Sequence, residues 1–194
     1  MNMTSHFRPA ATLLLLLTVL TGAAYPALVT GVARIALREQ ASGSLLVQDG
    51  KLRGSRLIGQ AFTSPQYFWG RPSATGPMPN NAAGSSGSNQ GPSNPALLDT
   101  VKGRIAALRA ADPGNPAPVP VDLVTASASG LDPHISPAAA LYQAGRVAHA
   151  RNLDRAAVEA LVRKHTEQPL LGFLGEARVN VLELNLDLDQ ATQR

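Results

Sequence analysis

The feature that most constrains this chain is a stretch of 25 residues without a charged side chain, Pro9 to Ala33, which lies between Arg8 and Arg34. As a helix it would be about 37 Å long, enough to cross a hydrocarbon core of about 30 Å with some tilt. Its seven Leu and three Val residues favour insertion by roughly 3 to 6 kcal/mol. We therefore predict a short tail at 1–8, one transmembrane helix at 9–33 and a soluble domain at 34–194.

A cleaved signal peptide is the alternative to a membrane span. Arg8, the leucines and the small residues at 21–24 resemble its charged region, its apolar region and its cleavage site. Apolar residues continue beyond this point, which favours a span. Pro26 should kink the helix, and a neighbouring membrane helix would satisfy the carbonyl that the proline leaves free. A secreted binding module would require cleavage near Ala24, which N-terminal sequencing of the mature chain detects.

The charge balance argues against nucleic acid as a partner. The chain has 17 Lys plus Arg and 13 Asp plus Glu residues, and it has no cysteine. It contains no run of like charges and no alternation of aromatic and basic residues. Neither the missing cysteines nor the charges beside the span (Arg8 on one side, Arg34 and Arg38 with Glu39 on the other) decide which side of the membrane the domain occupies.

The rest of the sequence predicts an α/β (α+β) domain behind the single transmembrane helix. Extended segments are expected at 45–47 and 53–62, and a strand is expected at 121–124. The strongest strand pattern is the nearly perfect alternation of apolar and polar residues at 179–188. The aromatic segment 63–73 should fold back onto the core, and 74–92, rich in Gly, Ser, Asn and Pro, should form a long loop.

Three helices are predicted from their first residues. Asn94 followed by Pro95 is a capping residue followed by a proline at the first helical position, and the helix should end near Ala111. Ser136 and Pro137 repeat this pattern for a helix to about His149. Asp154 should cap a third helix, which runs to about His165.

A search for catalytic motifs is mostly negative. The Gly- and Ser-rich segment 84–91 lacks the Lys-Ser/Thr pair of a Walker A motif, and the four histidines show no zinc-binding spacing. One alternative is a membrane-anchored serine hydrolase that uses Ser127 or Ser129 with His134; Asp132 lies two residues before that histidine. The sequence lacks a nucleophile elbow, and residues two apart on an extended segment do not form a preassembled triad. Segment 125–136 is therefore also interpreted as a loop whose side chains satisfy turn and cap hydrogen bonds.

Several motifs, in a fixed order along the chain, resemble the C subunit of the Kdp potassium-transporting ATPase. The resemblance extends from Phe7 to Asp189. Its segments are QAFT at 60–63, YFWGRPS at 67–73, SNQGPSNP at 88–95, VPVDLVT at 119–125, SGLDPHIS at 129–136, HTE at 165–167, LGFLG at 171–175 and VNVLELN at 179–185. Ala128, where a glycine is expected, and Trp69 depart from the family pattern.

The resemblance implies a non-catalytic accessory subunit of a four-subunit, ATP-driven potassium uptake pump of the inner membrane. Its partners would be a P-type ATPase subunit, a channel-like potassium-binding subunit and a small membrane subunit. ATP and potassium would bind at the level of the complex, with no cofactor or metal held by this chain. The family's C subunit is described as a catalytic chaperone that raises the affinity for ATP. The tail at 1–8 would be cytoplasmic and the domain at 34–194 extracytoplasmic, so coupling to ATP would be indirect.

Two loop segments are the candidate contact surfaces for a partner or for nucleotide coupling, because loops on a scaffold tend to carry function. They lie at 85–94 and at 129–136. Arg71 is a further candidate for a partner's carboxylate, and an internal salt bridge is the alternative for it. The candidate residues are Arg71, Ser88, Asn89, Gln90, Asn94, Ser129, Asp132, His134 and Ser136.

Overall fold

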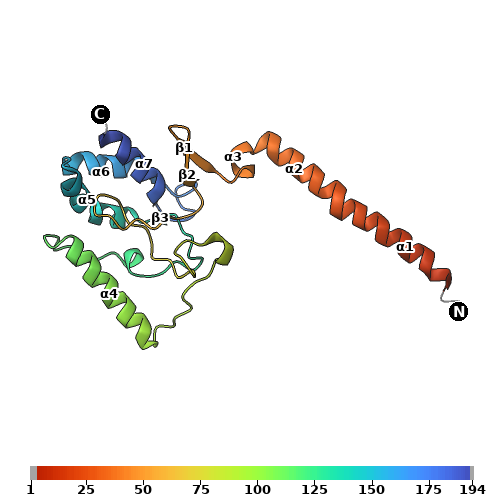
Figure 1. Ribbon diagram of the computed structural model, residues 1–194, viewed down its shortest axis with the longest axis horizontal. Helices are drawn as coiled ribbons and strands as arrows, with labels where there is room; N and C mark the ends of the chain where they lie inside the picture. The colour runs from red at the N-terminus through yellow and green to blue at the C-terminus, as the bar shows by residue number, and fades with distance from the viewer. Residues whose placement is uncertain (1–3, 193–194) are drawn as a thin grey trace. The chain divides into compact units, whose positions relative to one another are not determined.

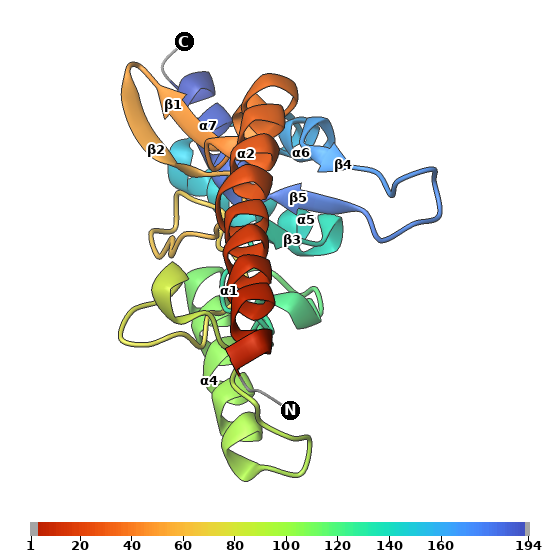
Figure 2. The same ribbon diagram turned by 90° about the vertical axis from the view of Figure 1, so that its right-hand side faces the viewer.

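The computed structural model describes residues 4–192, so residues 1–3 of the predicted tail lie outside the described part (Figures 1 and 2). The chain divides into two compact units, Met1–Leu45 and Leu46–Arg194. The first unit is dominated by one long helix, and the second contains helices and small sheets. This mixed domain behind a single apolar helix confirms the predicted fold class.

The N-terminal unit is a nearly continuous helix that is long and apolar enough to span a membrane. Helix α1 covers Thr4–Val19, a five-residue π-helical turn covers Leu20–Ala24, and α2 covers Tyr25–Ala36. The span His6–Ala36 has a window of mean hydropathy 1.9, and none of that window is buried. The Tyr25 N–H donates to the Leu20 carbonyl in the π turn. This wide turn comes directly before Pro26, which lacks a helical donor.

The second unit contains the remaining elements apart from the short helix α3 (Arg38–Ala41) and the first residue of β1. A hairpin is formed by β1 (Leu45–Gln48) and β2 (Lys51–Ser55). The long loop that follows carries only a 3-10 turn at Ala82–Gly84, as predicted. The helices are α4 (Pro95–Ala111), α5 (Pro137–Arg151), α6 (Arg155–Lys164) and α7 (Val181–Thr192).

A three-stranded antiparallel sheet with the order β3-β5-β4 lies beside these helices. Its strands are short: β3 is His134–Ile135, β4 is Thr166–Glu167 and β5 is Arg178–Asn180. Val179 on the central strand pairs with Ile135 on one side and Thr166 on the other. The sheet therefore joins the segment before α5 to both arms of the hairpin that connects α6 to α7.

The three helices predicted from their caps are confirmed. Asn94, Ser136 and Asp154 each accept a hydrogen bond from a backbone N–H in the first turn of the helix that follows. These caps satisfy donors that would otherwise have no helical partner. Helix α5 contributes the most buried apolar residues to the core. The buried apolar residues of α5 are Ala139, Ala140, Tyr142, Ala144, Val147 and Ala148.

The aromatic segment lies on the core as predicted, although it has no regular secondary structure. Phe68 is fully buried. Two side-chain amides replace the missing backbone partners of this segment: Asn185 on α7 pairs with the N–H (2.9 Å) and carbonyl (3.0 Å) of Phe68. Gln143 on α5 pairs with the N–H (2.8 Å) and carbonyl (3.1 Å) of Trp69. Two helices thus hold consecutive residues of one extended segment.

The strand predicted at 179–188 is wrong beyond its first two residues. Strand β5 ends at Asn180, and α7 begins at Val181. The Asn180 side chain accepts a hydrogen bond from the Glu183 N–H (3.2 Å), as a capping residue does. Leu184 and Asn185 are both buried, which a strand with one buried face does not allow. The signal that was missed is Asn180 followed three residues later by Glu183, which resembles a capping box.

The strand predicted at 121–124 is also wrong, because this segment forms a 3-10 turn at Val121–Leu123. Leu123 and the adjacent Val124 are both buried, so the apolar residues do not alternate between two faces. The turn brings the Asp122 carboxylate to the Ser136 N–H (2.7 Å) at the start of α5. The extended segment expected at 53–62 is strand only to Ser55, after which the chain turns at 55–58.

Candidate functional site

Three of the predicted site residues meet in one polar cluster. Arg71 Nη1 donates to Asp132 Oδ2 (3.0 Å), and the His134 backbone N–H donates to Asp132 Oδ1 (3.0 Å). The His134 ring Nδ1 lies 3.6 Å from the same oxygen. All three side chains are about a quarter exposed. Of the two roles considered for Arg71, the structure therefore contains the internal salt bridge.

The Asp132 carboxylate is held ionised by this cluster. Burial raises its pKa, but the hydrogen bonds from His134 and the Arg71 guanidinium outweigh that effect and lower the pKa to about 2. A carboxylate with these partners accepts protons poorly at neutral pH. It is therefore suited to fixing the loop at Arg71 against the segment that leads into β3 rather than to acid–base catalysis.

The serines of the hydrolase alternative form turn hydrogen bonds. Ser127 is buried, and its Oγ accepts from the Gly130 N–H (2.7 Å). Ser129 Oγ accepts from the Leu131 N–H (3.1 Å) and lies 3.3 Å from Ser127 Oγ. Within residues 4–192, no hydrogen bond joins either hydroxyl to the His134 ring. A serine nucleophile needs such a base within reach, so this geometry does not favour a hydrolase.

Two other predicted site residues are helix caps. Asn94 Oδ1 accepts from the Ala96 N–H (3.0 Å) at the start of α4. Ser136 Oγ accepts from the Ala139 N–H (3.0 Å) at the start of α5 and lies 3.3 Å from Asp122 Oδ1. Both side chains are thus committed to local structure.

The two predicted contact loops touch one another, and the candidate Ser129 takes part through its backbone carbonyl rather than its side chain. The Ser86 N–H and the Ser85 hydroxyl both donate to the Ser129 carbonyl (3.0 Å each). Gly130, with φ +67°, fits closely here: a Cβ on it would lie 2.8 Å from the Ser86 carbonyl oxygen. Ser88 and Asn89 are exposed and Gln90 is half-buried. Segment 88–90 is therefore a surface that remains accessible to a partner.

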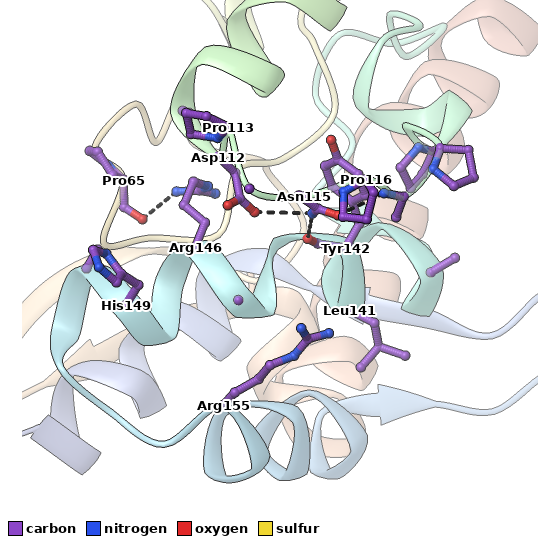
Figure 3. A pocket seen from close by; sticks show the side chains of 18 residues that line it. Pro65, Asp112, Pro113, Asn115, Pro116, Leu141, Tyr142, Arg146, His149 and Arg155 are labelled. Carbon is purple, nitrogen blue, oxygen red and sulfur yellow. Dashed lines mark hydrogen bonds between the residues drawn. The ribbon is translucent and has the colours of Figure 1, made fainter.

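A cavity of about 860 Å³ was not predicted from the sequence (Figure 3). It lies between α5 and the proline-rich segment that follows α4. Asn115 holds its wall by donating to Asp112 Oδ2 (3.1 Å) and to the Tyr142 carbonyl (2.9 Å). The only sequence signal for it is the proline-rich composition of 112–118, which ends α4.

The charged groups of this cavity are mostly satisfied by the chain itself. Arg146 donates to the carbonyls of Pro65 and Tyr67 and to Gln143 Oε1, and its guanidinium lies 4.3 Å from the centre of the Trp69 ring. Burial lowers the pKa of Arg146 to about 10, against the opposing effects of Asp112 and Tyr142, so the group stays charged at neutral pH. The Tyr142 hydroxyl is buried without a hydrogen-bond partner. The cavity therefore lacks a set of free polar groups that converge on one point.

Metal ligands do not gather in the described part of the chain: no three His, Cys, Asp or Glu side chains of residues 4–192 could hold one ion.

Comparisons with known proteins indicate the same family along nearly the entire chain. A family model described as "K+-transporting ATPase, c chain" matches residues 7–190. The chain is 67% identical over 187 residues to the potassium-transporting ATPase KdpC subunit of Polaromonas naphthalenivorans, covering 96% of this chain and 95% of the relative. It is 64% identical over 187 residues to the KdpC subunit of Methylococcus capsulatus, covering 96% and 98%. It is 62% identical over 188 residues to the KdpC subunit of Herpetosiphon aurantiacus, covering 97% of each.

Proposed function

The chain belongs to the KdpC family of K+-transporting ATPase subunits, and from this premise we propose that it acts as a non-catalytic accessory subunit in assembly of the pump. The observation that carries the proposal is a match over residues 7–190, which includes nearly all of the apolar helix and nearly all of the soluble domain. The hydrogen bonds that Ser127, Ser129 and Asp132 make within the chain support a role without chemistry of its own.

The proposed partners are a P-type ATPase subunit, a channel-like potassium-binding subunit and a small membrane subunit. We expect ATP and potassium to bind to those subunits. The test is affinity purification of the tagged full-length chain from detergent-solubilised membranes, with mass spectrometry of the recovered proteins. Recovery of the first two partners supports the proposal. Recovery of the chain alone, under conditions that preserve other membrane complexes, contradicts it.

The apolar helix is proposed to anchor the chain once in the inner membrane, with the soluble domain on the outer side. The sequence contains no cysteine, so a single introduced cysteine is a clean reporter of topology. Ser88 is exposed and lies outside any helix or strand, which makes Ser88→Cys a suitable position. We expect a membrane-impermeant maleimide to label it in intact cells. Labelling only after the membrane is permeabilised would reverse the proposed orientation.

A catalytic-chaperone role, in which this subunit raises the pump's affinity for ATP, would then have to act across the membrane. A domain on the outer side cannot touch cytoplasmic ATP, so the effect would pass through the apolar helix and its neighbours. The ATPase activity of the pump, titrated with ATP in the presence and absence of this chain, tests the role: loss of the chain should raise the KM for ATP. Cross-linking of a photoreactive ATP analogue to Ser88, Asn89 or Gln90 in the assembled pump would contradict indirect coupling.

A further inference from the structure

A second cavity, of about 330 Å³, lies in the soluble domain beside helix α4. Its walls combine α4, the 3-10 turn at Val121–Leu123, the aromatic segment and the chain just before that segment. The walls are mostly apolar, and their larger side chains include Phe62, Trp69, Leu108 and Leu123. Cavities of this size with apolar walls and a few polar groups are typical of sites for small molecules. Which molecule fits depends on the polar groups among these walls.

Arg104 on α4 brings a positive charge to this cavity. Its Nη1 donates to the Val124 carbonyl (2.8 Å), and no carboxylate of residues 4–192 forms an ion pair with it. Burial lowers the pKa of Arg104, and no neighbouring acid opposes that shift. A guanidinium has several further N–H donors. Arg104 can therefore bind an additional acceptor and keep its hydrogen bond to Val124.

The position of Arg104 is fixed by its helix and by the turn that it contacts. Arg104 and Leu108 are four residues apart, so they lie on the same face of α4, and Leu108 is buried. Val124 directly follows the turn that supplies Leu123 to the cavity wall. A half-buried charge without a counter-charge costs free energy beside apolar walls. A bound anion would offset this cost.

A second guanidinium, that of Arg71, belongs to a residue that lines the same cavity. Its Nη2 lies 3.5 Å from the Ala126 carbonyl, two residues beyond the Val124 carbonyl that Arg104 binds, so the two arginines approach one short segment. The Nε of Arg71 is buried and has no hydrogen-bond partner in the described part of the chain. Asp132 is paired with Arg71 and leaves the charge of Arg104 uncompensated. The surroundings of the cavity therefore carry a net positive charge.

A carboxylate with an apolar body fits these groups. A guanidinium binds a carboxylate through two parallel hydrogen bonds, and the single negative charge of a carboxylate matches the one uncompensated charge of Arg104. A phosphate monoester carries a charge of about −2 at neutral pH and would bring an excess of negative charge against apolar walls. Phe62 and Leu123 in those walls suit the uncharged part of a small organic acid.

We propose that this cavity binds a small organic carboxylate, with the carboxylate on Arg104 and the apolar body against Phe62 and Leu123. The site is formed by the soluble domain of this chain alone. The proposal goes beyond the proposed function and does not depend on assembly with other subunits.

The test uses the full-length chain in detergent, with benzoate as the probe. Trp69 is the single tryptophan of the chain and lines the cavity, so its fluorescence reports binding there when it is excited where benzoate does not absorb. We expect benzoate to change this emission in a saturable way. No saturable change with benzoate overturns the proposal.

Three further ligands separate the charge from the apolar body. Benzamide has the ring without the charge, acetate has the carboxylate without the ring, and inorganic phosphate has negative charge without an apolar body. Each should bind at least about tenfold more weakly than benzoate, because each lacks one of the two contacts. Benzamide that binds as tightly as benzoate would make the site merely apolar, and phosphate that does so would make it a general anion site. Either result overturns the proposal.

Two pairs of variants locate the binding. Arg104→Gln should weaken benzoate binding about tenfold and remove its preference over benzamide, whereas Arg109→Gln, at an exposed position of α4 outside the cavity wall, should change neither. Ala107→Phe places a ring at the cavity wall and should abolish the fluorescence change. Ala106→Phe, at the exposed neighbouring position, should preserve it.

Thermal unfolding of each variant shows whether it folds. If Arg104→Gln does not fold, the comparison of Ala107→Phe with Ala106→Phe decides. Benzoate binding that survives both Arg104→Gln and Ala107→Phe, or that is weakened equally by the control variants, overturns the proposal.

Discussion

Gln143 and Asn185 are 1% exposed, whereas Leu171 and Phe173 are 76% and 73% exposed in the turn at 168–177 between β4 and β5, here called the apolar tip. The buried amides stabilise a segment that has no strand neighbours, because they provide its backbone with hydrogen-bond partners. The exposed apolar residues contribute nothing comparable to the fold. The two departures from the usual distribution of polar and apolar residues therefore differ in kind: the amides serve folding, whereas the apolar side chains of the tip are not buried within the domain.

The largest effect that this comparison predicts is at Asn185. Asn185→Leu removes both hydrogen bonds to Phe68 and leaves a buried N–H and a buried carbonyl without partners. We expect the free energy of unfolding to fall by about 2 to 4 kcal/mol. Urea unfolding of the full-length chain in detergent, followed by the fluorescence of Trp69, measures it. Gln190→Leu, at an exposed position of the same helix, is the control and should change stability little. An unchanged free energy of unfolding in Asn185→Leu would show that the buried amide does not stabilise the segment, and would contradict the comparison.

The sequence predicted the parts of the fold that depend on neighbouring residues. Asn94, Ser136 and Asp154 cap the helices that follow them, and each cap bond spans two or three residues. The amide network was not predictable in the same way, because Asn185 and Phe68 are 117 residues apart in the sequence. The alternation at 179–188 fits a strand as well as the helix that forms, and only the capping sequence at Asn180 distinguishes them.

The candidate site shows the same difference between features that depend on neighbouring residues, which were predicted, and features that depend on the folded chain, which were not. The alternative of an internal salt bridge for Arg71 is what the structure contains, and Ser136 acts as the cap that its position before Pro137 indicated. The apolar tip was noticed only as part of a family resemblance, because in a sequence an apolar turn and a short core segment have the same composition. Burial, which distinguishes them, is a property of the folded chain.

The next largest effect concerns Asp132, whose cluster lies between the two extremes of burial. Its pKa is lowered from 3.8 to about 2, so its stabilising effect is complete above about pH 4 and is lost as the pH falls through about 2. Asp132→Asn should therefore lower the free energy of unfolding by about 2 kcal/mol at pH 7.

The pH dependence of unfolding provides the check. The difference between wild type and Asp132→Asn should shrink as the pH is lowered from 5 to 2, measured by urea unfolding at each pH. Asp49→Asn, at a side chain that is 76% exposed, controls for the loss of one negative charge. A difference that stays constant over this range would show that the carboxylate is not held by Arg71 and His134.

A smaller effect is expected at the helix caps. It tests whether two predicted site residues serve the stability of the fold rather than contact with a partner. Ser136→Ala and Asn94→Ala each remove a bond to the first turn of a helix. We expect each to lower the free energy of unfolding by about 1 kcal/mol, with unchanged recovery of the ATPase subunit. Unfolding and the co-purification assay together measure this. A variant that keeps normal stability but recovers less ATPase subunit would show that the residue contacts a partner.

The smallest effect tests the difference between the buried amides and the apolar tip most sharply. Leu171→Asn places a residue that tolerates positive φ at the φ of +56° and removes no internal packing, so the free energy of unfolding should rise by about 0.5 to 1 kcal/mol. The reverse exchange is available at Asn152, which is exposed, ends α5 and has φ +54°; Asn152→Leu should lower stability by a similar amount. Urea unfolding of both variants measures the pair. A Leu171→Asn variant that is less stable than the wild type would mean that the leucine contributes to the fold after all, and the distinction between the buried amides and the apolar tip would fail at that residue.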